Sequence, residues 1–396
     1  MSGYHERNWE PFPVHKLTRV DRPTTVINEE NIQRVRERDA GFNRCVLGEY
    51  GPALLKEIMR GYSIMKYPLS GSQFWMMLNM VPHVNGMAAA SKAPLPNDPA
   101  VMSRHIKETA YFLRGDMVGI CELPPYAVYT HKFNQMDPTV ADRPIELTHK
   151  YAIAILVDQD WRTAEAFTGS DWISNAMSML AYSNSGFIAI ILAEYIRRLG
   201  YSARAHFAAH YELMVPPILL WAGLGEMSRI GDCVVNPFLG PRFKAAIVTT
   251  DLPLASDKPI DFGLQDFCSK CKKCARECPG GALSDGGKEM HNGYEKWPTD
   301  VKKCTSMRIG NKKGAGCGTC VKVCPWNKPY TLFHRGVSWA MQRSSIARSI
   351  AIWGDDFMGY GKPNYRNKWW LDLEDAGDDG VLRIPNKGRE TTRCLI

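Results

Sequence analysis

The sequence lacks a long uninterrupted apolar run. Its most apolar stretch, FIAIILAEYI at 187–196, is broken by a glutamate within ten residues, and VPPILLWAG at 215–223 contains two prolines. A membrane-spanning helix needs about 20 consecutive apolar residues. We therefore predict no intrinsic membrane segment.

An export signal is also missing from the N-terminus as written. MSGYHERNWEPFPVHKLTRV has neither an apolar core with a small-residue cleavage site nor a twin-arginine pair. We expect a cytoplasmic location on this ground. A mature form whose leader had been removed would start in the same way, and would be periplasmic or membrane-associated.

Cysteine is scarce outside one block. Cys45, Cys121, Cys233 and Cys394 are scattered, and we interpret them as small buried hydrophobic residues. The other eight cysteines fall between 268 and 324. Disulfide scaffolds are typical of small secreted chains rather than of a dense block within 396 residues. The block therefore indicates metal binding.

The spacing within the block is that of a bacterial two-cluster ferredoxin with one ligand displaced. The first half reads CxxCxxCxxxCP from Cys268, and the second has Cys304, a twelve-residue gap, and CxxCxxxCP from Cys317. In this pattern the cysteine before each proline binds the other cluster. The first [4Fe-4S] cluster is then held by Cys268, Cys271, Cys274 and Cys324, and the second by Cys278, Cys304, Cys317 and Cys320.

Structural zinc is the alternative. A zinc site, however, takes four ligands from two CxxC pairs, and it needs neither a third CxxC spacing nor a proline after the last cysteine. The net charge of +8 fits the cluster interpretation, since the lysine pairs in CKKC, DVKKC and GNKKG all lie in the cysteine-rich region. Such lysines would balance negatively charged clusters. We expect no nucleic-acid partner.

The remaining three hundred residues read as mixed α/β. We predict an amphipathic helix near 101–114, a strand at 150–157, a long helix within 172–199 and a strand at 243–254. The small polar run Ser183 to Gly186 interrupts the long helix. It either breaks or caps the helix, leaving Tyr182 as a half-buried core residue, or allows close approach of a large planar ligand.

Four segments together resemble the catalytic subunit of corrinoid-dependent reductive dehalogenases. These are AYSNSGFIAIILAEYIRRLGYSAR at 181–204, the stretch at 216–254 containing AGLGE, the CxxCxxCxxxCP block, and CGTCVKVCPWNKP at 317–329. The tail FHRGVSWAMQRSSIARSIAIWGDDFMGYGKP at 333–363 is similar to the same family.

The resemblance implies an α/β (α+β) fold, in which a nitroreductase-like cobalamin-binding domain joins a bacterial ferredoxin-like module with two [4Fe-4S] clusters. We expect an N-terminal region at 1–100, the catalytic domain at 101–255, the cluster module at 256–330, and a C-terminal extension at 331–396 that covers the active site. The cobalamin would be base-off, and D-x-H-x-x-G, the signature of a histidine-ligated cobalamin, is absent.

The resemblance also implies a reaction: reduced cobalamin, Co(I), breaks a carbon–halogen bond and a tyrosine beside a cation donates the proton. By position Tyr182 matches the tyrosine and Arg242 the cation. A guanidinium would favour the phenolate left behind. The partners would be a halogenated organic substrate and an external electron donor, such as a ferredoxin, a flavodoxin or a membrane-linked donor.

Further pocket candidates follow from position, and each has an ordinary structural alternative. Ser178 lies one helical turn before Tyr182 and either shares its face or faces solvent. Asn184 belongs to the small polar run. His206 or His210 stands where relatives tend to carry an amide, although a surface or core histidine is equally compatible. Trp326 either lines an apolar pocket or simply packs.

Two other functions are compatible with the motifs. An epoxyqueuosine reductase-like enzyme also combines cobalamin with two [4Fe-4S] clusters, but acts on a tRNA base and would need an extended basic surface. A cobalamin-free iron–sulfur electron-transfer protein would use the large domain only for docking. A measurement of bound cobalt separates the electron-transfer protein from both enzymes, because only the enzymes bind cobalamin. Neither the halogen nor the oligomeric state follows from the sequence.

Overall fold

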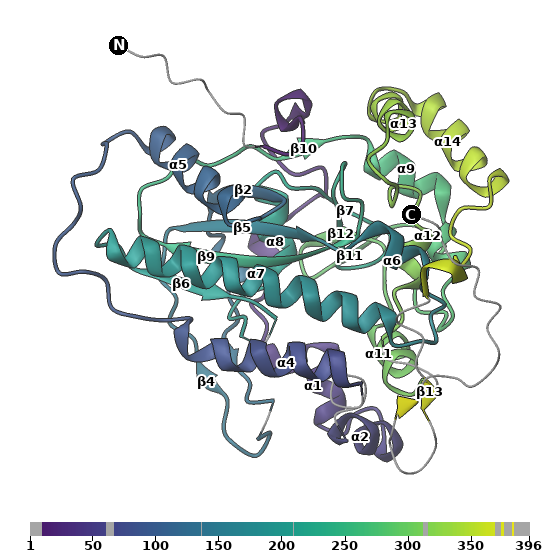
Figure 1. Cartoon of the computed structure of the whole chain (residues 1–396), viewed down its shortest axis with the longest axis horizontal. Helices are drawn as coiled ribbons and strands as arrows, with labels where there is room; N and C mark the ends of the chain where they lie inside the picture. The colour runs from purple at the N-terminus through teal and green to yellow at the C-terminus, as the bar shows by residue number, and fades with distance from the viewer. Residues whose placement is uncertain are drawn as a thin grey trace.

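The computed structural model describes residues 10–60, 67–135, 137–208, 210–311, 316–368, 374–375 and 382–383. Its centre is a four-stranded antiparallel sheet in the order β2-β5-β9-β6 (Figure 1). These strands are β2 (Met117–Glu122), β5 (Tyr151–Asp158), β6 (Ala203–His206) and β9 (Phe243–Thr250). The predicted strands at 150–157 and 243–254 are thus confirmed.

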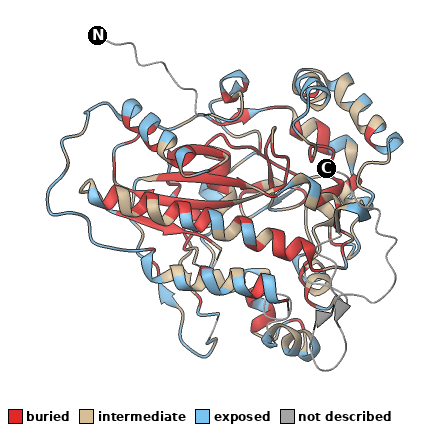
Figure 2. Cartoon of the chain, viewed as in Figure 1, coloured by how far each residue is buried: buried red, intermediate tan, exposed pale blue. Residues whose placement is uncertain are grey.

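The central strands are buried on both faces (Figure 2). Alternate side chains of β5 point to opposite sides, as the two-residue period of a strand requires. Ala152, Ala154 and Leu156 belong to one core, whereas Ile153 and Ile155 belong to the other. The near-continuous apolar sequence of this strand follows from having a core on each side.

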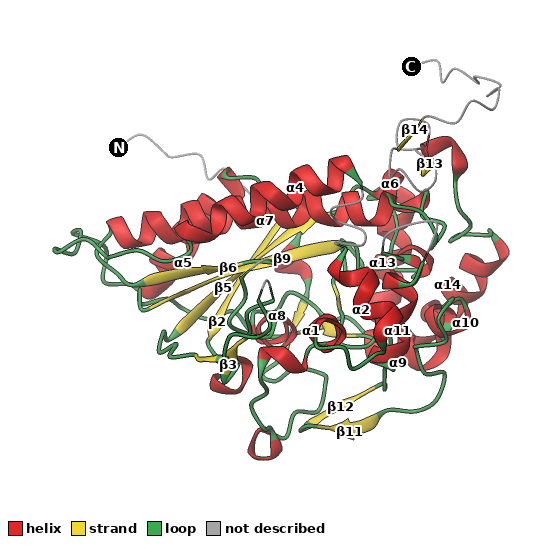
Figure 3. Ribbon diagram, turned by 90° about the horizontal axis from the view of Figure 1, so that it is seen from below, coloured by secondary structure: helices red, strands yellow, loops and turns green. Residues whose placement is uncertain are grey.

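Helix α7 (Ile173–Arg198) covers one face of the sheet, and α8 (Val215–Trp221) lies on the other (Figure 3). On the α7 side, α4 (Pro68–Met80) packs along α7, and α5 (Pro99–Phe112) packs on β2. The predicted helices near 101–114 and within 172–199 are both confirmed. The second ends as expected, with Gly200 at a φ of 88°.

Helix α7 runs unbroken through its small polar run, so the predicted break or cap there is wrong. A Cβ on Gly186 would lie 2.9 Å from the Phe207 ring. The hydroxyl of Ser185 donates to the carbonyl of Tyr182, within the helix. The small residue at 186 therefore lets a protein ring approach the helix, and a planar ligand is not needed to explain it.

Helix α7 is also long and apolar enough to cross a membrane by length and composition, with a mean hydropathy of 1.5. The sequence argument had excluded such a segment because of its charged residue. More than half of the apolar stretch, 56%, is buried inside the protein. Its apolar character is therefore accounted for by packing on the sheet and on α4.

The cysteine-rich region forms a separate group of short helices beside the sheet (Figure 1). They are α9 (Leu264–Cys271), α10 (Lys273–Arg276), α11 (Val301–Ile309) and α12 (Thr319–Val323), with the hairpin β11 (Glu289–His291) and β12 (Tyr294–Lys296) between α10 and α11. Gly263 and Gly318 precede α9 and α12 in left-handed conformations, which glycine adopts without strain.

Helices α13 (Leu332–Arg343) and α14 (Ser345–Phe357) pack on each other, and α14 packs on α9. The described part of the predicted C-terminal extension thus lies on the cluster module. A buried charge cluster fixes it there: Asp355 of α14 pairs with Lys273, between two cluster ligands, and with Lys328 at 2.6 Å. The predicted domain boundaries stay predictions.

The other described α-helices and strands are short. They are α1 (Gly41–Val46), α2 (Pro52–Met59), α6 (Trp161–Glu165), β1 (Thr18–Arg19), β3 (His131–Lys132), β4 (Arg143–Pro144), β7 (Glu226–Met227), β8 (Val234–Val235), β10 (Ile260–Asp261), β13 (Glu374–Asp375) and β14 (Leu382–Arg383).

Candidate active site

The four thiols predicted for the first cluster lie close enough for their charges to interact. Burial raises the pKa of Cys324, and Cys268, Cys271 and Cys274 raise it further. The pKa of Cys268 is raised by burial and by two of the same neighbours. The tertiary structure therefore brings the thiol after α12 to the three thiols of α9 and α10, as the crossed ligation requires.

The second predicted set comes together in the same way. Burial raises the pKa of Cys304, and the charges of Cys278 and Cys317 add to it. Cys320 interacts with Cys304 and Cys317. Among the described residues no three Cys, His, Asp or Glu side chains already stand at metal-binding distances, so both ligand sets rest on spacing and on these charge interactions.

Of the scattered cysteines, Cys45 and Cys121 are buried, as predicted, and Cys394 lies outside the described residues. Cys233 is only half-buried. It interacts electrostatically with Cys320 of the second set on one side and with Lys244 of β9 on the other. This thiol therefore lies between the cluster module and the sheet.

Tyr182 is half-buried on α7 and has a cation beside it, but that cation is not the predicted one. The Nζ of Lys244 lies 4.9 Å from the centroid of the Tyr182 ring. Lys244 is the second residue of β9 and shares the α7 face of the sheet with Ala246 and Val248. The structure thus places a lysine side chain over the Tyr182 ring, at the start of β9.

Arg242, predicted to be the cation beside Tyr182, has other partners in the structure. Its guanidinium donates to both carboxylate oxygens of Asp158, at 2.9 and 3.1 Å, and to the Asn327 side chain at 2.7 Å. Burial raises the pKa of Asp158 to about 6, even though Arg242 acts in the opposite direction. Arg242 therefore ties the start of β9 to the end of β5 and to the cluster module.

Ser178 and Asn184, predicted to line the pocket, take different positions on α7. Ser178 is half-buried one turn before Tyr182, and its hydroxyl accepts a hydrogen bond from Gln159 at 3.0 Å. Asn184 is exposed. The helical spacing correctly placed Ser178 with Tyr182, whereas nothing in the described structure brings Asn184 to this face.

His210 belongs to a polar network around Glu212. Its Nδ1 lies 2.9 Å from Arg204, which pairs with Glu212 at 3.0 Å, and Arg143 pairs with the same carboxylate. Burial and nearby cations lower the pKa of His210 to about 4. His206 is fully buried and shares a hydrogen bond with Thr249. These contacts give both histidines structural partners.

Trp326 is 4% exposed and packs edge-on against Phe262 and Phe267, with ring centroids 4.9 and 5.7 Å apart. It lines a cavity under α13 and α14 rather than the surface beside Tyr182. The structure therefore separates Trp326 from the tyrosine with which the sequence had grouped it.

Sequence reasoning missed Lys244 and Cys233. A signal for Lys244 was present, because GPRFKAAI offers two cations two residues apart, which in a strand point to the same face. The pattern could not choose between them. Cys233 had no local signal, since its neighbours come from α12 and β9.

A family model described as a 4Fe-4S double cluster binding domain matches residues 267–327. This match falls within the predicted module at 256–330 and confirms the double-cluster prediction. It also excludes the structural-zinc alternative as the explanation of the cysteine block.

Curated relatives carry the predicted family name. A tetrachloroethene reductive dehalogenase of Sulfurospirillum multivorans is 30% identical over 309 residues, covering 70% of this chain and 61% of the relative. A protein of the same name from Desulfitobacterium hafniense is 35% identical over 225 residues, covering 54% and 39%. The chain thus spans about 40% to 60% of the length of these relatives.

Solved structures agree over nearly the whole chain. A catabolic reductive dehalogenase, solved in complex with 3-bromo-4-hydroxybenzoic acid, is 43% identical with a TM-score of 0.88, covering 95% of this chain and 53% of that protein. A structure with the same values is described as a reductive dehalogenase that suggests a mechanism for B12-dependent dehalogenation. The predicted fold and cofactor classes are borne out by these neighbours.

The alternative family matches over a smaller part. An epoxyqueuosine reductase of Bacillus cereus is 33% identical over 122 residues, which cover 27% of this chain. The match to the dehalogenase of Sulfurospirillum multivorans is more than twice as long. This chain is therefore similar to reductive dehalogenases over most of its length.

Proposed function

We propose that this chain carries the catalytic centre of a reductive dehalogenase, which replaces a halogen on an organic substrate by hydrogen. The reaction consumes two electrons and one proton, and releases a halide ion. The observation that carries the proposal is the contact of Lys244 with Tyr182, on the side of the sheet next to a cluster ligand set. This arrangement supports delivery of a proton and of electrons at one place.

A corrinoid would fit the junction between the sheet and the cluster module. Tyr182, Ser178, Lys244 and Cys233 are all half-exposed there, although they come from three different parts of the fold. The neighbour described as B12-dependent supports the same cofactor class. When bound, a corrinoid would supply the nucleophilic, strongly reducing metal that breaks the carbon–halogen bond.

Tyr182 would act as the general acid. Its hydroxyl proton passes to the substrate carbon as the halide leaves, and the phenolate that forms is stabilised by the Lys244 ammonium. A cation favours the charged form of a neighbouring tyrosine. Ser178, held by Gln159, lies on the same face of α7 and would help to orient the bound molecule.

The second cluster would be the one nearer the reacting centre. Cys320 interacts with Cys233, which interacts with Lys244. The α12 loop also approaches the start of α7 closely, because a Cβ on Gly318 would lie 3.0 Å from the Cβ of Ser174. The first ligand set instead includes Cys268 and Cys271 of α9, the helix on which α14 packs. Electrons from an external donor would therefore enter at the first cluster.

Anaerobic reconstitution with iron, sulfide and cobalamin tests the proposal. We expect about eight irons and one cobalt per chain, as two [4Fe-4S] clusters and one corrinoid require. Halide release from organohalides, driven by a low-potential reductant, should then be measurable. Eight irons without cobalt would instead favour the electron-transfer function, and cobalt without halide release would favour a different corrinoid reaction.

A further inference from the structure

A buried lysine beside the second ligand set has no paired carboxylate. Lys322 of α12 stands between Cys320 and Cys324 in sequence and is 5% exposed. Its ammonium donates to the backbone carbonyl of Phe167. In the described part of the chain acidic side chains act on this lysine only from a longer distance, without an ion pair. The ammonium is therefore a positive charge inside the protein that no carboxylate neutralises directly.

The same ammonium lies near a thiol of the second ligand set. A Cβ on Gly169, two residues after Phe167, would be 3.6 Å from the Sγ of Cys317. The charges of Lys322 and Cys317 also interact. The loop that accepts the hydrogen bond from the lysine is thus the loop that contacts this thiol.

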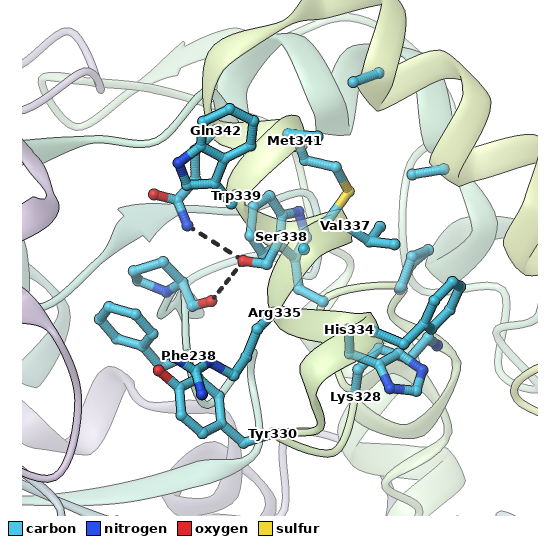
Figure 4. A pocket seen from close by; sticks show the side chains of 18 of the residues that line it. Phe238, Lys328, Tyr330, His334, Arg335, Val337, Ser338, Trp339, Met341 and Gln342 are labelled. Atoms are coloured by element: carbon cyan, nitrogen blue, oxygen red, sulfur yellow. Dashed lines mark hydrogen bonds between the residues drawn. The ribbon is translucent and has the colours of Figure 1, made fainter.

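The lysines beside the first ligand set are paired instead. Lys273 forms ion pairs with Asp355 and, at 3.0 Å, with Asp356. Lys328 pairs with the same Asp355 carboxylate at 2.6 Å, and lies beside His334 in the wall of a cavity under α13 (Figure 4). Two carboxylates therefore offset the positive charge of these two lysines.

The paired group acts on the thiols of the first set. Lys273 follows Cys271 by two residues, and the charges of Lys273 and Asp355 both act on that thiol. Lys328 interacts in the same way with Cys324. The two ligand sets thus have different surroundings, one with balanced charges and one with a buried cation.

This difference affects how easily each cluster accepts an electron. Reduction adds one negative charge to a [4Fe-4S] cluster, and the potential depends on the charges, hydrogen bonds and solvent around it. A positive charge in the protein interior acts more strongly than one in water, because the interior screens it less. The ammonium of Lys322 should therefore favour the reduced form of the second cluster.

We propose that Lys322 raises the midpoint potential of the second cluster above that of the first, where Asp355 offsets the effect of the lysines. One electron then passes from the first cluster to the second, so that the first is oxidised and the second is reduced. The difference in potential requires only the two clusters. Its use in bringing electrons to Tyr182 rests on the proposed function.

A redox titration followed by low-temperature EPR tests the proposal on protein loaded with iron and sulfide, without cobalamin. The second cluster of the wild type should have the higher midpoint potential. Lys322→Met should lower that potential and leave the first cluster unchanged, whereas Lys322→Arg, which keeps the charge, should resemble the wild type. Asp355→Asn should raise the potential of the first cluster alone, and Lys328→Met should lower it. Shifts of opposite sign distinguish an effect of charge from a general loss of packing.

Lys303→Met is the matched control. This lysine precedes the ligand Cys304, but its side chain is 61% exposed, so water should screen its charge and neither potential should move. The proposal is wrong if the first cluster has the higher potential in the wild type, or if Lys322→Met leaves the second potential unchanged. Equal shifts of both potentials in Lys322→Met would also contradict it, since they would indicate a change in the packing of α12. Neither cobalamin nor substrate is present, so these results are independent of halide release.

Discussion

Replacing Lys244 by methionine should slow halide release by about two orders of magnitude. The ammonium lies 4.9 Å from the centre of the Tyr182 ring. At this separation a full negative charge on the tyrosine would gain about 3 kcal/mol, taking an effective dielectric constant of about 20. Losing that stabilisation in the transition state corresponds to about a hundredfold decrease in rate.

The assay is single-turnover halide release by the reconstituted Lys244→Met protein under anaerobic conditions, with excess reductant. Iron and cobalt contents should match the wild type, because no cluster ligand is changed. Lys244→Arg is the matched control and should retain most of the rate, since it keeps the charge. A Lys244→Met protein with the wild-type rate would refute the role of this cation, and an equally slow Lys244→Arg protein would indicate a steric effect.

Four further outcomes are expected. Tyr182→Phe should abolish halide release while both cofactor types stay bound; full activity would rule out the tyrosine as proton donor. Cys278→Ala should damage the second cluster and spare the first, which low-temperature EPR can resolve, and loss of the first cluster alone would contradict the crossed ligation. Asp355→Asn should lower the free energy of unfolding by about 3–5 kcal/mol, because it removes the buried carboxylate that Lys273 and Lys328 share; Asp356→Asn removes the second, more exposed carboxylate of Lys273 and should cost less. Stability should also fall as the pH drops from about 6.5 to about 4, because the unfolded chain gains a proton at His210 that the folded protein, with a pKa of about 4, accepts only at lower pH. His210→Gln should flatten this part of the denaturation profile against pH, and an unchanged slope would argue against the assignment.

The fold and the double-cluster module could be predicted because their signals are local. A run such as CxxCxxCxxxCP fixes which thiols a tight loop can present, and the CP ending implies the crossed ligand. The long helix and the two central strands were predictable from the periodicity of their apolar residues. The end of the helix was indicated by Arg197 and Arg198 in its last turn and by Gly200 beyond it. The folded structure keeps these loops, strands and helices because residues close to each other in sequence already favour them.

The candidate site was only partly predictable, because its contacts join distant segments. Tyr182 and Ser178 were paired correctly by helical spacing, but the cation came from β9, where two positions were equally compatible with the pattern. In the structure the Asp158 carboxylate binds the Arg242 guanidinium. Lys244 is therefore the cation that contacts the Tyr182 ring.

What the sequence determined by itself is therefore the chemistry available: eight thiols at cluster spacing, a tyrosine on a long helix, and two nearby cations. The tertiary structure decided which of these groups meet. Helix α7 continues unbroken through its small residues, and Gly186 leaves room there for the Phe207 ring. Trp326 lies in the wall of a different cavity, where two phenylalanines hold its ring. Such outcomes depend on which faces pack together, and a local pattern does not encode that choice.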